Sequence, residues 1–265
     1  MGVVALATCL AGEARAQVLL SEGFSYKQNF DSLASSGTGN PWIDNSTLPG
    51  WYADRGISGP LSTYDAGAGS STAGSLYSFG TGTDPERALG SLASGATGSL
   101  TYGVRFQNDT LSSVQGLTIS YAGEQWRDNN NATAQTLELS YRVSSSPITS
   151  ADALTPPGSG GWIPFKPLDF TSPVHSGGSG ALDGNAPANR TVFVGTLVAG
   201  ALLNPGDELF IRWFDADDTG FDHALAIDDL SVTFTAVPEP GEYGAAVALG
   251  LLGFALFRRY ALKRP

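Results

Sequence analysis

The chain has 265 residues, of which 34 are Gly and 15 are Pro; 42% of the residues are hydrophobic and only 15% are charged. The apolar content is sufficient for a core and excludes disorder throughout, and the Gly and Pro content excludes a helix bundle. Without the three acidic and five basic side chains at the two ends, residues 17–237 keep 22 acidic and 9 basic ones, a net charge of −13 that repels nucleic acid and other polyanions.

The first 16 residues are typical of an export signal. An apolar stretch from Val3 to Ala11 precedes Ala14-Arg15-Ala16, a small-x-small pattern that suits signal peptidase. We therefore predict a signal peptide over residues 1–16. No basic residue precedes the apolar stretch, so an alternative is that Met1 lies inside a longer signal. The only cysteine, Cys9, lies in this segment, which leaves the body without a disulfide or a cysteine-built metal site.

Apolar residues recur at every second position along the body, as in half-buried strands. No amphipathic stretch of helical length interrupts this pattern before the C-terminal tail. About eight strands with long polar connections predict an all-β fold, a two-sheet jelly-roll sandwich over residues 17–236. In chain order, the predicted strands cover residues 18–20, 28–30, 98–107, 117–121, 137–143, 191–197, 209–213 and 225–234.

Several connections are long and rich in Gly, Ser, Asn and Asp, namely residues 35–46, 65–75 and 172–190. Loops beyond ~12 to 15 residues are uncommon in compact domains and tend to be functional or mobile. Residues 155–161 form a Pro/Gly hinge. We interpret this hinge as an insertion within one domain, because the strands that follow it are too few for a second sandwich.

Acidic residues are concentrated near the end of the body, where residues 205–230 hold eight carboxylates and one basic side chain, Arg212. Closely spaced carboxylates repel one another, so they either face water or share a cation. Asp215, Asp217 and Asp222 have a spacing that suits Ca²⁺, with Gly220 allowing a turn between them. The alternative is that these aspartates cap turns and face solvent.

The strand predicted over residues 225–234 changes its buried face along its length. Leu225 and Ile227 share one parity, whereas Leu230 and Val232 share the other. A β-bulge near Asp228 and Asp229 would produce this shift.

The chain ends with a motif, an apolar run and a basic cluster. The motif is Val237-Pro238-Glu239-Pro240, the run covers residues 243–257, and the basic residues are Arg258, Arg259, Lys263 and Arg264. Fifteen residues at ~1.5 Å rise span about 22 Å, which flanking residues and snorkelling arginines extend toward the ~30 Å hydrocarbon core. We predict a transmembrane helix over residues 243–257, with the basic cluster in the cytoplasm and the body outside.

This tail resembles the PEP-CTERM sorting signal of Gram-negative bacteria that make extracellular polysaccharide. The resemblance covers residues 237–265 and implies an exosortase as partner, a temporary anchor in the inner membrane, and the cell surface or extracellular matrix as destination. The alternative is an ordinary single-pass anchor behind a proline linker.

The body contains four characteristic motifs: Asn29-Phe30-Asp31-Ser32-Leu33, Leu48-Pro49-Gly50-Trp51-Tyr52, Gly123-Glu124-Gln125-Trp126-Arg127, and a run from Arg212 to Val232 that ends in Ala226-Ile227-Asp228-Asp229-Leu230-Ser231-Val232. With these motifs, the body resembles jelly-roll accessory modules of secreted bacterial proteins, of the carbohydrate-binding and MAM type. The resemblance extends over most of residues 24–235 and implies a jelly roll without established chemistry. In such folds an ion commonly ties the first strand to the last, which implies a pairing of Asp31 with Asp228 or Asp229.

A second candidate site is a strand face opposite the core. A sugar ring would stack on Trp126 while its hydroxyls bond to charged neighbours. The alternative is that Trp126 covers a second small core between salt bridges. The residues of this candidate ligand face are Arg105, Glu124, Trp126, Arg127 and Arg212.

We predict a non-catalytic exported surface or matrix protein whose β-sandwich acts by binding or as a structural element. The alternative is a lectin-like module for exopolysaccharide. A third hypothesis is a glycoside hydrolase that uses Glu124 and Glu138 as paired carboxylates. Of cofactors, only a structural Ca²⁺ is expected.

Overall fold

The computed structural model describes residues 17–57 and 59–236, together with Phe254, Arg258 and Arg259. The predicted signal peptide, the Val237–Pro240 motif, Lys263, Arg264 and most of the predicted membrane segment lie outside the described residues. Among the residues that the structure describes, no helix is both long and apolar enough to cross a membrane.

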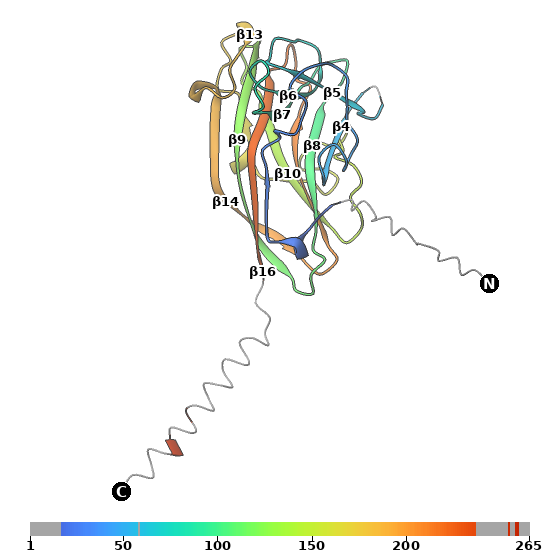
Figure 1. Cartoon of the computed structure of the whole chain (residues 1–265), viewed down its shortest axis with the longest axis vertical. Coiled ribbons are helices and arrows are strands. Elements are labelled where there is room, and N and C mark those ends of the chain that lie inside the picture. The colour runs from blue at the N-terminus through green and yellow to red at the C-terminus, as the bar shows by residue number, and fades with distance from the viewer. Residues whose placement is uncertain (1–16, 58, 237–253, 255–257, 260–265) are drawn as a thin grey trace, which may run out of the picture.

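The body is all-β and consists of two mixed sheets (Figure 1). In the seven-stranded sheet, β15 lies between β8 and β10; β1 and β4 pair with the other edge of β8, while β11 and β12 pair with β10. Its strands are β1 (Val18–Leu19), β4 (Trp51–Arg55), β8 (Leu100–Gln107), β10 (Thr136–Ser144), β11 (Ile163–Pro164), β12 (Phe170–Thr171) and β15 (Glu208–Asp215).

The nine-stranded sheet is built around the long pair β9 and β16, with β14 beside β9 at one edge (Figure 1). Its strands are β2 (Ser25–Gln28), β3 (Asn40–Pro41), β5 (Thr63–Gly67), β6 (Ser75–Phe79), β7 (Ala88–Leu92), β9 (Val114–Asn129), β13 (Ser179–Ala181), β14 (Arg190–Leu203) and β16 (Ala224–Ala236). Three short 3₁₀ turns, η1 (Leu20–Glu22), η2 (Lys166–Leu168) and η3 (Pro187–Asn189), complete the described elements.

The predicted strands after residue 98 are confirmed as β8, β9, β10, β14, β15 and β16. Their alternating apolar residues face the other sheet and form the main core, as Tyr102 of β8 and Tyr121 of β9 do. Strands β4 to β7 were not predicted. Several of their residues are buried on both faces, as in β7, so they lack the alternation that marks a half-exposed strand.

Each sheet also carries a small second core on its outer face. On the nine-stranded sheet, Trp126 packs with Tyr77 and Phe79. On the seven-stranded sheet, Trp162 packs with Tyr52 and Phe210. Trp162 comes from the connection between β10 and β11, which contains the Pro/Gly hinge. The long loops therefore cover much of both outer faces.

The predicted bulge in β16 is confirmed. The pairing of β16 with β9 shifts register between Asp228 and Ser231. Asp229 adopts a left-handed conformation with φ of 52° and is exposed, while Asp228 and Leu230 on either side of it are buried. The bulge therefore lets Ile227 and Leu230 both reach the core despite their opposite parity.

We expect Asp229→Val to destabilise the protein by ~1–2 kcal/mol, because a β-branched residue is disfavoured in the left-handed region. Asp229→Gly removes the same carboxylate without this steric cost. Chemical denaturation of the two variants therefore separates backbone strain from the loss of the charge. Equal stability of the Val and Gly variants would contradict the assigned conformation.

Candidate functional site

The carboxylates of the acidic loop after β15 are turned in different directions. Asp215 is buried, and its Oδ2 accepts a hydrogen bond from Ser91 Oγ at 2.7 Å. Asp222 Oδ1 accepts one from the backbone N–H of Asp218 at 2.9 Å, which is a turn-capping contact. Asp217 is exposed. These contacts match the turn-capping alternative for Asp222.

Asp31 contacts the start of β7. Its Oδ1 accepts a hydrogen bond from the backbone N–H of Arg87 at 3.1 Å. Asn29 Nδ2 donates to its Oδ2 at 2.5 Å. Glu86, the neighbour of Arg87, lies close to Asp228.

Three carboxylates meet on the outer side of the nine-stranded sheet, and we call them the carboxylate triad: Glu86, Glu124 and Asp228. One carboxylate oxygen from each lies within 4.8 Å of the other two. Within residues 17–57 and 59–236, this is the only group of three His, Cys, Asp or Glu side chains with such spacing, and it includes just one of the six predicted calcium ligands.

Strand pairing explains how residues so distant in sequence come together. Glu86 lies just before β7, Glu124 lies on β9, and Asp228 lies at the bulge of β16. Strand β16 runs between β7 and β9, with Ala226 opposite Glu124 and Asp228 opposite Ala122. The triad therefore spans three neighbouring strands.

The triad is largely shielded from water. Glu124 is 0% exposed and Asp228 is 3% exposed, whereas Glu86 is partly exposed. Glu124 Oε2 accepts a hydrogen bond from Trp126 Nε1 at 3.1 Å. Asp228 Oδ1 and Glu124 Oε1 have no hydrogen-bond partner among the described residues. Arg190 Nε lies 3.4 Å from Glu124 Oε1 and is the nearby positive charge.

Burial raises the pKa of both inner carboxyls. The pKa of Glu124 rises to about 7, because desolvation outweighs the attraction of Arg190. The pKa of Asp228 rises to about 9, mainly through desolvation, with further increases from the charges of Asp229 and Glu124. In the absence of a cation, the inner pair is thus driven toward the protonated form.

The five residues of the candidate ligand face are all buried, so the prediction of an open face is wrong. They also lie on two different sheets. Arg105 forms a salt bridge with Glu208 on the seven-stranded sheet. On the same sheet, the guanidinium carbon of Arg212 lies 3.6 Å from the ring centre of Trp162.

Trp126 belongs to the second small core of the nine-stranded sheet, as the alternative interpretation stated. Gly184 lies against its indole, so closely that an added Cβ would be 2.4 Å from Nε1. Arg127 donates to the backbone carbonyl of Gly69 at 3.0 Å and to Ser179 Oγ at 2.9 Å. These side chains hold covering loops in place.

The proposed hydrolase pair is also separated by the fold. Glu124 lies on the outer face of the nine-stranded sheet beside Trp126. Glu138 lies on β10 of the other sheet and pairs with Phe214. Phe214 in turn lies beside Arg212 on the outer face of that sheet. The main core therefore lies between the two carboxylates, and they cannot flank one glycosidic bond.

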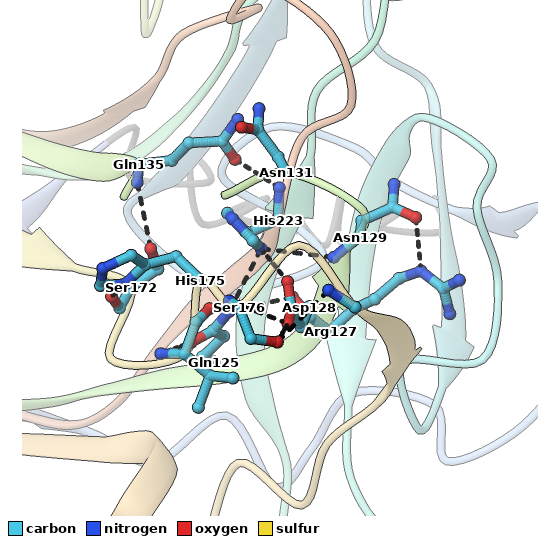
Figure 2. Close-up of polar contacts among 12 residues, drawn as sticks. Gln125, Arg127, Asp128, Asn129, Asn131, Gln135, Ser172, His175, Ser176 and His223 are labelled. Atoms are coloured by element: carbon cyan, nitrogen blue, oxygen red, sulfur yellow. Dashed lines mark hydrogen bonds and ion pairs between the residues drawn. The ribbon is translucent and has the colours of Figure 1, made fainter. Parts of the chain in front are cut away.

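A buried polar network, which sequence reasoning missed, surrounds His223 at the start of β16 (Figure 2). Its Nδ1 lies 3.4 Å from Asp128 Oδ1 and accepts a hydrogen bond from the backbone N–H of Asn129 at 3.3 Å. Gln125 exchanges two hydrogen bonds with the backbone of Val174, at 2.8 and 2.6 Å. The network attaches the loop after β12 to the end of β9, so its evident role is to position that loop.

No protein-family model matches the chain, and no curated protein matches its sequence. Similar solved structures include an arabinose-bound α-L-arabinofuranosidase, MgGH51, at 9% identity and a TM-score of 0.35 over 80% of this chain. The present chain spans only 27% of that enzyme.

Two further similar structures match over nearly their whole length. The K3 adhesin domain of Lys-gingipain from Porphyromonas gingivalis has 13% identity and a TM-score of 0.35, over 74% of this chain and 98% of that domain. The CBM22-1 xylan-binding domain of Xyn10C from Paenibacillus barcinonensis has 8% identity and a TM-score of 0.30, over 78% and 99%. Because every TM-score is below 0.5, the function has to be inferred from the side chains of this chain.

The buried Asp215 predicts a pH dependence of stability. Burial raises its pKa to about 8, far above its usual value. Because the folded-state pKa is the higher one, the contribution of Asp215 to stability is fully present below about pH 4 and is lost as the pH rises toward 8, at up to ~1.4 kcal/mol per pH unit. Asp215→Asn keeps the shape of the side chain but removes the titration.

We therefore expect denaturation of Asp215→Asn between pH 4 and 8, with chelator present, to show a shallower loss of stability than the unmodified chain. An unchanged slope would show that Asp215 is not the titrating group.

Proposed function

We propose that the protein is an exported, non-catalytic binding module with a jelly-roll body that contacts an uncharged polysaccharide. The observation that carries this proposal is an exposed aliphatic strip along edge strand β14, the β14 patch. It consists of Val192, Val194, Leu197 and Leu202, whose exposed fractions are 62, 79, 57 and 46%.

The β14 patch is unusual for an edge strand. Natural edges are generally protected by charged residues, prolines or β-bulges. Strand β14 has two shifts of register, but residues 191–203 contain no charged residue and no proline. This uncharged segment belongs to a body with a net charge of −13. A contact surface without charge suits a partner without charge, and it does not favour nucleic acid or acidic polymers.

Beside the patch, the outer face of the nine-stranded sheet is lined by small hydroxyl side chains. Leu197 pairs with Thr118 on β9. On the other side of Thr118 lies Thr233 of β16, and Thr233 pairs with Ser25 of β2. This row combines aliphatic contact with hydroxyl groups across four strands. Such a surface suits a neutral sugar chain, which presents both C–H faces and hydroxyls.

The tail supports surface display. Strand β16 ends at Ala236, immediately before the Val237–Pro240 motif. We propose that an exosortase recognises this motif while the apolar run anchors the chain in the inner membrane, and that the body then reaches the cell surface or matrix.

Leu197→Glu places a charge in the middle of the β14 patch without touching the core. We expect it to weaken co-sedimentation of the full chain, held in mild detergent, with a neutral exopolysaccharide by at least about tenfold, or ~1.4 kcal/mol. The matched control is Leu111→Glu, since Leu111 is 95% exposed and lies in the connection between β8 and β9, outside the β14 patch. Absence of binding by the unmodified chain, or equal loss in both variants, would contradict a polysaccharide contact at β14.

Mass spectrometry of the mature protein tests the sorting step. We expect a new C-terminus within or next to residues 237–240, and retention of residues 241–265 when Glu239 is changed to Ala. Glu242→Ala is the control, because it removes a nearby acidic residue outside the motif. A surface-located protein that still ends at Pro265 would argue against exosortase sorting.

A further inference from the structure

We propose that the carboxylate triad of Glu86, Glu124 and Asp228 binds one divalent, oxygen-preferring cation such as Ca²⁺. The site differs from the acidic loop at residues 215–222, and two of its three ligands were not among the residues expected to bind calcium. Cation binding at the triad does not require the proposed polysaccharide contact.

The first argument is geometric. Calcium binds oxygen ligands at about 2.3 to 2.6 Å, so ligands on opposite sides of one ion are about 5 Å apart. The three carboxylate oxygens all lie within 4.8 Å of one another, which fits the coordination sphere of a single ion. Glu86 is partly exposed, so water can complete the ligand set from that side.

The second argument is the state of the inner carboxylates. Glu124 and Asp228 are almost completely buried, and each has one oxygen without a hydrogen-bond partner among the described residues. Burial of an unsatisfied carboxylate oxygen is costly. A cation between the two residues would compensate both buried carboxylates at once, whereas turn capping or solvation explains neither.

The third argument is charge balance. The positive charge near the inner carboxylates is that of Arg190, which lies 3.4 Å from Glu124 and is shared with the exposed Asp229 at 3.1 Å. Arg87 adds an attractive charge near Glu86. If all three carboxylates of the triad are ionised, these shared charges compensate them only in part. A divalent cation would supply the remaining positive charge.

The site would also secure the loop that covers Trp126. Asn185 Nδ2 donates to Glu86 Oε2 at 2.6 Å, and Arg190 begins β14 at the end of the same loop. Gly184 precedes Asn185 in this loop, which begins after β13, and it lies against the indole of Trp126. An ion on the triad therefore joins strands β7, β9 and β16 and fixes the loop through Glu86.

Terbium luminescence is a direct test, because Trp126 donates a hydrogen bond to Glu124 and lies within range to sensitise a lanthanide at the triad. The full chain in mild detergent is titrated with Tb³⁺ under tryptophan excitation and then with Ca²⁺. We expect saturable emission from one ion per chain that Ca²⁺ displaces. We also expect Ca²⁺ to raise the melting temperature.

Asp228→Asn and Glu86→Gln keep the side-chain shape but remove one charged ligand each. We expect each to weaken terbium binding by at least about tenfold. Asp217→Asn is the matched control in the acidic loop and should bind as the unmodified chain does. Near-ultraviolet circular dichroism establishes that each variant is folded, and Glu86→Gln, at a partly exposed position, keeps the test valid if Asp228→Asn does not fold.

Three results would overturn the proposal. The first is the absence of calcium-displaceable emission from the unmodified chain. The second is unchanged binding in folded Glu86→Gln. The third is loss of binding in Asp217→Asn alone, which would place the ion in the acidic loop instead.

Discussion

The packing of Trp213 between the two sheets fixes the directions of two polar residues of β15, Arg212 and Asp215. Its ring stacks on Trp51 of its own sheet, with centres 6.2 Å apart and planes 9° apart, and meets Tyr121 of the other sheet edge-on at 5.4 Å. Such aromatic contacts add to the free energy of burial and fix the inward face of β15. With Trp213 inward, the alternation of the strand sends Arg212 outward and Asp215 inward.

Both consequences are visible in the structure. Asp215 lies inside the core and hydrogen-bonds to Ser91, so it is directed away from the acidic loop that it begins. Arg212 lies on the outer face, where Trp162 and backbone carbonyls of Ala151 and Thr155 surround its guanidinium. Burial lowers its pKa to about 9, which reflects the cost of covering this charge. The covering segment therefore compensates the charge with carbonyl oxygens and an aromatic face.

The same alternation of side chains explains which parts of the fold the sequence predicts. Period-two patterns identified β8, β9, β10, β15 and β16, and the change of parity located the bulge at Asp229. The pattern also identified outward residues such as Arg105 and Trp126, but it could not show that loops cover them. Their partners, Glu208 and Gly184, lie 103 and 58 positions away in the sequence. The lengths of the loops are the one signal of this covering role in the sequence.

The triad was missed for a related reason. Asp228 was identified by the bulge, but Glu86 and Glu124 become its neighbours only because β16 pairs between β7 and β9. The order of strands in a sheet formed by distant segments is not contained in local periodicity. Glu86 also belongs to an unpredicted region of the chain, next to a strand that is buried on both faces.

The distribution of charge along β14 connects the two proposed surfaces. The strand begins at Arg190, which compensates part of the triad's charge, and continues through 13 residues without any charge. Asp228 and Val192 both pair with Ala122, so the triad and the β14 patch lie in one row across the sheet. Loss of the triad's charge, by protonation or by a bound cation, removes a negative field that would otherwise act on the adjacent end of the patch. Neutralising the triad therefore favours both the stability of the sheet and an uncharged contact surface beside it.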